Sequence, residues 1–230
     1  MKMVVKCSKA KINEQYLLCE YYAYKIFNSI TDYSFRVKLI EVTYVDTGGK
    51  HKTGTSYAYI IESINQLAMR HGSSPVETAK IADLLTNQNQ LALVYLFQYF
   101  IGNTDWSVSG RHNMAMIISE ESNDPKPYPI PYDFDNAGIV NTNYAVPDAS
   151  LGIESVRERL YRGLCMDENI IKLASERFIH SKEALYDIYN NSGLLDKAVL
   201  TNTLHYIDEF YRIIENEKGF RNHILDRCRQ

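Results

Sequence analysis

The segment NQLALVYLFQYFIG at 89–102 constrains the fold strongly, because it holds one of the longest apolar runs in the chain. Its composition and its final glycine predict a helix that ends at Gly102. The apolar part, LALVYLFQYFI at 91–101, is shorter than the roughly 18 residues that a membrane-spanning helix needs. A chain of 230 residues can bury a substantial core. The sequence therefore predicts a globular fold without a membrane span.

The segment before this helix is expected to contain a strand, a helix and two further strands. MKMVVKC alternates like a half-buried strand, and residues 13–30 have helical spacing with Asn13 as the expected N-cap. FRVKLIEVTYVD and TSYAYIIE alternate on either side of TGGK, which predicts a β-hairpin.

The pattern changes after Glu62, where helical segments predominate. The later elements are expected in this order: helices at 64–71 and 75–86, short strands at 113–119 and 127–134, and helices from about 151. We therefore expect an α+β fold with a small part at 1–63 and a mostly helical part at 64–230.

Composition and charge exclude some functions. With 45% hydrophobic and 23% charged residues the chain is an ordinary globular protein. Its formal net charge is −3 and no window has a dense Lys/Arg stripe, so nucleic-acid binding is not predicted. No signal-peptide pattern follows Met1. This leaves two compartments open: the cytoplasm, or an extracytoplasmic site if an upstream segment carries the targeting signal.

The four cysteines are Cys7, Cys19, Cys165 and Cys228, and they form no close pair. A zinc site is therefore not predicted, and we expect buried thiols.

Two polar segments follow the apolar helix: GNTDWSVSGRHN at 102–113 and PYDFDNAG at 131–138. Carboxylates and amides with this spacing could cap turns. They could also hold a metal ion and the phosphates of a nucleotide, because hard cations take oxygen ligands.

The stretch FQYFIGNTDWSVSGRHN…PIPYDFDNAGIV resembles bacterial proteins related to the CotH kinases of the spore coat, and more distantly FAM20-type and HipA-like kinases. The resemblance implies a protein-kinase-like two-lobe fold, with a partial β-rich N-lobe at 1–63 and a helical C-lobe at 64–230. It also implies phosphoryl transfer from ATP, with Mg²⁺ or Mn²⁺, to a protein or small-molecule hydroxyl.

The resemblance assigns roles to four polar residues. Asp105 would orient the acceptor hydroxyl, and Asn113 and Asp133 would hold the metal. Asp135 would be a second metal carboxylate on the same face if the strand continues. Which of the two aspartates is the main ligand stays open.

The resemblance extends upstream to LCEYYAYKIF at 18–27, which is similar to a helix whose glutamate pairs with a nucleotide-binding lysine. Glu20 would be that glutamate. Lys2 is the first candidate for the lysine, and Lys6 is the alternative. The hinge that binds adenine through its backbone would lie near residues 60–63.

Two features differ from the usual kinase pattern. Asp105 and Asn113 are eight residues apart, whereas the spacing in protein kinases is about five residues, so either the loop bulges or the Asn is reached differently. No glycine-rich segment precedes the lysine strand, so the N-lobe is expected to be truncated.

Other interpretations are also open. Asp105 could cap a turn with Trp106 as a packed anchor, and Asp135 and Asn136 could form an Asx turn. The chain could be an inactive, pseudokinase-like binding or scaffold module, or a truncated fragment. It could also be a metal-dependent phosphoester hydrolase, although it lacks a His-rich cluster.

Further polar residues also have two interpretations. Arg157, Arg159 and Arg162 could contact phosphate or an acidic substrate, but a solvated helix face with local salt bridges is the commoner arrangement. His112 could be catalytic or could hold the loop backbone. The 18 tyrosines are expected to pack in the core and its edges.

Overall fold

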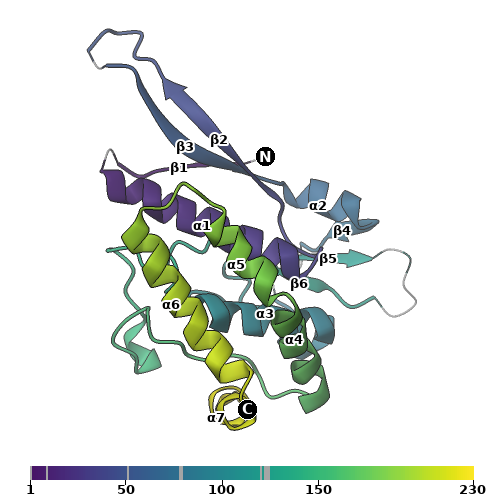
Figure 1. Cartoon of the computed structure of the whole chain (residues 1–230). Helices are drawn as coiled ribbons and strands as arrows, with labels where there is room; N and C mark the ends of the chain where they lie inside the picture. Colours follow the sequence, from purple (N-terminus) through teal and green to yellow (C-terminus); the bar gives the residue numbers. More distant parts are fainter. Residues whose placement is uncertain (1, 9, 51, 78–79, 120, 122–124) are drawn as a thin grey trace.

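The computed structural model describes residues 2–8, 10–50, 52–77, 80–119, 121 and 125–230. Within these ranges the chain has an α+β fold with two small antiparallel sheets and seven α-helices (Figure 1). No helix in the described part of the chain is long and apolar enough to cross a membrane.

The first sheet contains β1 (Lys2–Val5), β3 (Gly54–Ile61) and β2 (Val37–Tyr44), in that spatial order. Both pairings are antiparallel, and Tyr59 of the central strand lies opposite Val4 and Leu39. Helix α1 (Lys11–Ile30) connects β1 to β2 and packs against β2 and β3. The predicted order of strand, helix, strand, strand is confirmed.

The start of α1 differs from the prediction. The helix begins at Lys11, and its N-cap is Ala10, which provides no side-chain hydrogen bond. Asn13 lies inside the first turn, where its side-chain amide donates to the Ser8 hydroxyl. The prediction of Asn13 as N-cap is therefore wrong, because Asn13 holds the preceding segment instead of capping the helix.

The β2–β3 hairpin extends away from the helices (Figure 1). Its turn is built by Asp46, whose carboxylate accepts hydrogen bonds from the N–H groups of Gly48 and Lys50, each at 2.8 Å. Gly49 adopts a φ of 67°, which favours glycine. The predicted hairpin around the Gly-Gly turn is confirmed.

The second sheet follows helix α2 (Ile64–Arg70). It contains β4 (Ser73–Pro75), β5 (Met114–Ser119) and β6 (Tyr128–Pro131), in that order. The two predicted strands at 113–119 and 127–134 are present, although the second ends at Pro131.

The helix predicted at 75–86 is wrong, although residues 78–79 lie outside the described part. Pro75 ends strand β4, and only the short 3₁₀ helix η1 (Asp83–Leu85) follows. The Asp83 carboxylate accepts hydrogen bonds from the Tyr95 hydroxyl at 2.7 Å and from the Ser109 N–H at 3.0 Å. These bonds hold the segment against α3 and the loop after it.

Helix α3 (Gln88–Ile101) lies at the centre of the core. It packs against α1, β6 and helix α4 (Glu168–His180). Asn87 caps its start by accepting from the Gln90 N–H at 3.0 Å, and Gly102 ends it with a φ of 65°. The predicted helix and its end at Gly102 are confirmed.

The C-terminal part contains fewer helical residues than predicted. Its helices after α4 are α5 (Lys182–Asn190), α6 (Lys197–Ile214) and α7 (Glu217–His223). Apart from the 3₁₀ turn η2 (Ala149–Leu151), residues 149–167 form turns and irregular structure. The helix predicted from about 151 is therefore wrong in this segment, where arginine side chains bind backbone carbonyls of neighbouring loops.

Two of the four cysteines form a disulfide, Cys165–Cys228. Residues Leu164 and Arg229 form a parallel bridge, which brings these distant cysteines together. Cys19 is a buried thiol as predicted, whereas Cys7 is exposed. The prediction of four buried thiols is therefore wrong, because sequence spacing does not show which distant segments pair.

Candidate functional site

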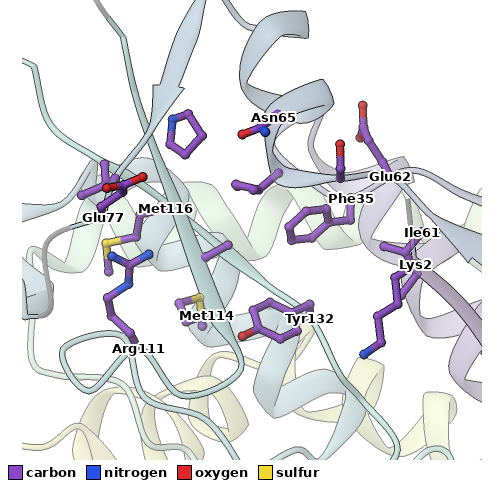
Figure 2. Close-up of a pocket in the computed structure, with 15 residues that line it drawn as sticks. Lys2, Phe35, Ile61, Glu62, Asn65, Glu77, Arg111, Met114, Met116 and Tyr132 are labelled. Atoms are coloured by element: carbon purple, nitrogen blue, oxygen red, sulfur yellow. The ribbon is translucent and has the colours of Figure 1, made fainter.

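A cavity of about 1020 Å³ lies where the first sheet meets β5 (Figure 2). Lys2, Phe35 and Ile61 line one side, and Met114 and Met116 of β5 line another. The walls are mainly apolar, and the volume is sufficient for a small organic ligand.

The polar loop after α3 begins with a turn that fixes Asp105. The side-chain oxygen of Asn103 accepts from the Asp105 N–H at 2.9 Å. The indole N–H of buried Trp106 donates to the Asn103 carbonyl at 3.0 Å. Trp106 is therefore a packed anchor, and the Asp105 carboxylate, which is partly exposed, projects from the turn.

The loop closes on itself between Ser107 and His112, whose backbones exchange two hydrogen bonds of 3.0 Å. This bridge returns the chain to Asp105. The Asn113 amide donates to the Asp105 carbonyl at 2.9 Å and to its carboxylate at 3.3 Å. Of the two alternatives, the loop bulges, and the bulge places Asn113 beside Asp105 despite their separation in sequence.

A second polar loop follows β6 and begins with Asp133. The Asp133 N–H donates to the Tyr24 hydroxyl at 2.8 Å, and the Phe134 N–H donates to the Glu20 carboxylate at 3.2 Å. Both acceptors belong to α1, so this helix fixes the position of the loop. Phe134 packs against Tyr24, with ring centroids 4.5 Å apart.

Asn136 joins the two loops. Its side-chain amide donates to the Asp105 carboxylate at 3.4 Å and to the Asp135 carboxylate at 3.1 Å. The other oxygen of Asp135 accepts from the exposed Tyr144 hydroxyl at 3.0 Å. The Asx turn predicted at Asp135 and Asn136 is replaced by this side-chain contact between loops.

Backbone conformation is unusual at these positions. Arg111, Asn113 and Asp133 have φ values of 53°, 51° and 63°. Such values are uncommon for residues other than glycine and often occur at functional sites. Because the strand ends at Pro131, Asp133 and Asp135 do not alternate along a strand. They nevertheless line one small cavity of about 110 Å³, together with Glu20.

The acidic residues interact electrostatically. Burial raises the pKa of Asp133, and the Asp135 and Asp105 carboxylates raise it further, whereas the Lys2 ammonium lowers it. Lys2 therefore acts electrostatically on Asp133. A cation at this position would be stabilised by the same negative charges.

Glu20 and Lys2 are not paired. Glu20 is only 7% exposed, and burial raises its pKa to about 7. Among the described residues, the ion pairs within 4.0 Å include Lys6 with Glu14 at 3.4 Å but none between Lys2 and Glu20. Lys6, the alternative phosphate contact, is thus held by Glu14.

The three predicted basic residues support the loops. Arg162 donates to the carbonyls of Thr104 and Trp106. Arg159 donates to the Phe100 carbonyl at 3.2 Å, and Arg157 to that of Gly138 at 2.9 Å. The predicted solvated helix face is wrong, because these side chains donate to backbone carbonyls at the end of α3 and in both polar loops. Of the salt bridges to Glu residues expected in its place, Arg159 forms one, with Glu209 of α6 at 3.2 Å.

The sequence prediction did not include Asn136, Tyr144 or Tyr24 as members of the site. Asn136 follows the Asp133–Asp135 pair directly, and an amide beside acidic residues is a signal that could have identified it. The main chain of His112 closes the loop with Ser107, whereas its imidazole lies 2.6 Å from the Asp105 carboxylate and not against the backbone. Tyr24 and Tyr144 reach the loops only in the folded chain. No local sequence pattern indicates these contacts.

Comparisons with known proteins give no assignment: no family model and no curated protein matches the chain. Within the described residues, no group of three or more His, Cys, Asp and Glu side chains is arranged to hold a metal ion. The carboxylates alone therefore do not form a complete metal site.

Proposed function

We propose that the chain binds a nucleoside triphosphate with Mg²⁺ and transfers its terminal phosphoryl group to a hydroxyl of a protein or small molecule. The observation that carries this proposal is the convergence of two loops. Asn113 contacts Asp105, and the Asn136 amide links Asp105 to Asp135. Asp105 and Asp135 also act electrostatically on Asp133. The strand, helix and hairpin beside them are elements that a partial protein-kinase-like small lobe would contain.

The loops adjoin the large cavity. Tyr132, which precedes Asp133, and Arg111 and Met114, which flank Asn113, all line it. Lys2 lines the same cavity and acts electrostatically on Asp133. A ligand in the cavity could therefore place its phosphates between Lys2 and the two loops.

The donor set fits Mg²⁺, which prefers one or two carboxylates together with phosphate oxygens. Asp133 and Asp135 would provide the carboxylates, and Asn113 the amide oxygen, because its nitrogen faces Asp105. When bound, the metal would neutralise charge on the phosphates.

Asp105 would orient the acceptor hydroxyl and receive its proton. It lies on the first loop and is partly exposed, which leaves it accessible to a substrate. Phosphoryl transfer depends mainly on positioning and charge stabilisation, so the fixed geometry of these loops is the property that the reaction needs.

The first test is thermal stabilisation of the full chain by ATP with and without Mg²⁺. Ligand at 100 times its Kd stabilises the folded state by about 2.7 kcal/mol. We expect the wild type to be stabilised by ATP with Mg²⁺ and Asp133→Asn to lose this metal-dependent part. Asp187→Asn, at an exposed position on α5, is the control and should behave like the wild type. Equal Mg·ATP affinity in Asp133→Asn and wild type would exclude the assigned metal role.

A non-catalytic binding module is the second candidate, and one observation favours it. One Asp105 oxygen lies 2.6 Å from the His112 imidazole, and the other accepts from Asn113 and Asn136. A carboxylate with both oxygens engaged needs a rearrangement before it can receive a proton. If ATP gives no stabilisation with either Mg²⁺ or Mn²⁺, this candidate is preferred.

A further inference from the structure

The backbone between β3 and α2, where a kinase-like hinge would lie, is already hydrogen-bonded. The Glu62 N–H donates to the Arg36 carbonyl at 2.9 Å, and the Ser63 N–H donates to the Gln66 side chain at 3.1 Å. The Ser63 carbonyl accepts from the Leu67 N–H at 3.0 Å. A ligand cannot use these groups without breaking the capping box of α2 or the contact with Arg36.

The preceding residues also have backbone partners. Ile60 and Ile61 belong to β3, the central strand, and pair with β1 on one side and β2 on the other. The main chain at 60–63 is thus largely committed to the fold. A base held in this cavity would have to be recognised mainly by side chains.

Several polar side chains of the cavity are also engaged. The Glu62 carboxylate pairs with Arg70 at 2.9 Å and accepts from the Arg36 N–H. The Ser63 hydroxyl bonds with Gln66. These groups hold α2 in place and are not available to read a base.

Asn65 differs from these residues. It is exposed and lines the cavity from the first turn of α2, and its side-chain amide has no hydrogen-bond partner within the described residues. In the view of Figure 2 the Asn65 amide lies along the upper edge of the cavity, and the Lys2 ammonium points toward the lower edge. Apolar side chains on opposite sides of the cavity, Phe35 on one and Met114 on the other, suit a flat ring.

We infer that the Asn65 side chain reads the edge of an adenine base, an inference that rests on the proposed function. An amide offers a donor and an acceptor side by side. The amino group and a ring nitrogen of adenine present the complementary pair, and Asn is a common bidentate partner of adenine. The base would lie at the Asn65 end, with the phosphates at the end formed by Lys2 and Asp133.

This assignment predicts how a substitution should change base preference. Asn65→Asp replaces the amide by a carboxylate, which only accepts hydrogen bonds. Guanine presents two adjacent donors, its ring N–H and its amino group, whereas adenine presents one donor beside an acceptor. Asn65→Asp should therefore shift preference from ATP toward GTP.

The experiment is calorimetric titration of the full chain with ATP and with GTP, each with Mg²⁺. We expect the wild type to bind ATP and Asn65→Ala to lose about tenfold or more in ATP affinity. Asn65→Asp should raise the ratio of GTP to ATP affinity by about tenfold or more. Asn222→Ala, at an exposed position on α7, is the matched control and should keep wild-type values. Circular dichroism checks that each variant is folded.

The outcomes separate this inference from the proposed function. If the wild type binds ATP and both Asn65 variants keep its affinities and its ratio, the role of Asn65 is wrong and the proposed function stands. If the wild type binds neither nucleotide with Mg²⁺, the proposed function is wrong, and this inference is wrong as well.

Discussion

Among single residues, Glu20 combines deep burial with an ionisable group. It accepts from the Phe134 N–H at 3.2 Å, and no lysine neutralises it within the described residues. Burial raises its pKa to about 7. Because the folded state then binds a proton more tightly than the unfolded state, ionisation of Glu20 opposes folding.

The pH dependence of stability follows from this shift. The stabilising contribution is fully present below about pH 4.5 and is lost as the pH rises to about 7. The loss is on the order of 3 kcal/mol. We expect Glu20→Gln to remove this part of the pH dependence, because its amide oxygen can still accept from Phe134. Urea unfolding between pH 5 and pH 8 measures the slope.

The control for this prediction is Glu183→Gln, an exposed position on α5, which should keep the wild-type slope. Identical slopes for Glu20→Gln and the wild type would show that Glu20 is not the group responsible.

Residue types alone indicated part of the site. Acids and amides after an apolar helix and strand suggest a metal and phosphates, and the resemblance singled out Asp105, Asn113, Asp133 and Asp135; their roles stay predictions. The contacts of Asn136 and Tyr144 were not predictable, because they depend on how two loops meet in space. The expected Lys2–Glu20 pair is absent among the described contacts. Glu20 faces Phe134 instead.

Among the elements, α6 supports both polar loops through Tyr206. Its ring lies between Arg157 and Arg159, whose guanidinium carbons are 4.0 Å and 3.5 Å from the ring centroid. A Cβ atom at Gly102 or at Gly138 would collide with the Tyr206 hydroxyl. The two loops therefore approach α6 closely because both carry glycine there.

Gly102→Ala should be more destabilising than its backbone angle alone explains. Gly102 and Gly49 have nearly equal φ values, 65° and 67°, but a Cβ at Gly49 would meet nothing within 4 Å. We expect Gly49→Ala to cost about 1 kcal/mol in the free energy of unfolding, and Gly102→Ala roughly 2–4 kcal/mol. Urea unfolding compares the two variants. Equal costs would show that contact with Tyr206 has no energetic effect.

Sequence patterns predicted the elements to different degrees. Helix α3 was predictable, because its apolar run and its terminal Gly102 agree with one another. The helix expected after residue 151 does not form, since Arg157, Arg159 and Arg162 bond with carbonyls of other loops and helices. The apolar spacing in that segment favours a helix, but tertiary contacts that the sequence pattern does not show favour the irregular conformation.

For the whole molecule, the disulfide links the chain's last residues to the segment that supports the first polar loop. Cys165 and Cys228 are 63 residues apart and enclose α4 to α7. Arg229 donates from its backbone to the Gly163 carbonyl and from its side chain to the Arg162 carbonyl. Arg162 in turn binds the loop that carries Asp105.

Reduction of this disulfide should lower the free energy of unfolding by about 4 kcal/mol, because a long loop gains freedom in the unfolded state. Urea unfolding with and without a phosphine reductant measures this. The double variant Cys165→Ser, Cys228→Ser should match the reduced wild type and be insensitive to the reductant. Cys7→Ser, which removes an exposed thiol, is the control and should keep the wild-type response. A wild type unaffected by reductant would contradict a stabilising disulfide.

Because of the bridge between Ser107 and His112, the distance between Asp105 and Asn113 in space does not depend on the number of residues between them in sequence. Because the backbone closes at these two residues, the residues between them, at the tip of the loop, lengthen the interval between Asp105 and Asn113 without separating the two side chains. A sequence motif that requires a fixed number of residues between the aspartate and the asparagine would fail to match such a chain. A pattern that allows the interval to vary and requires a turn former at the tip would recover it.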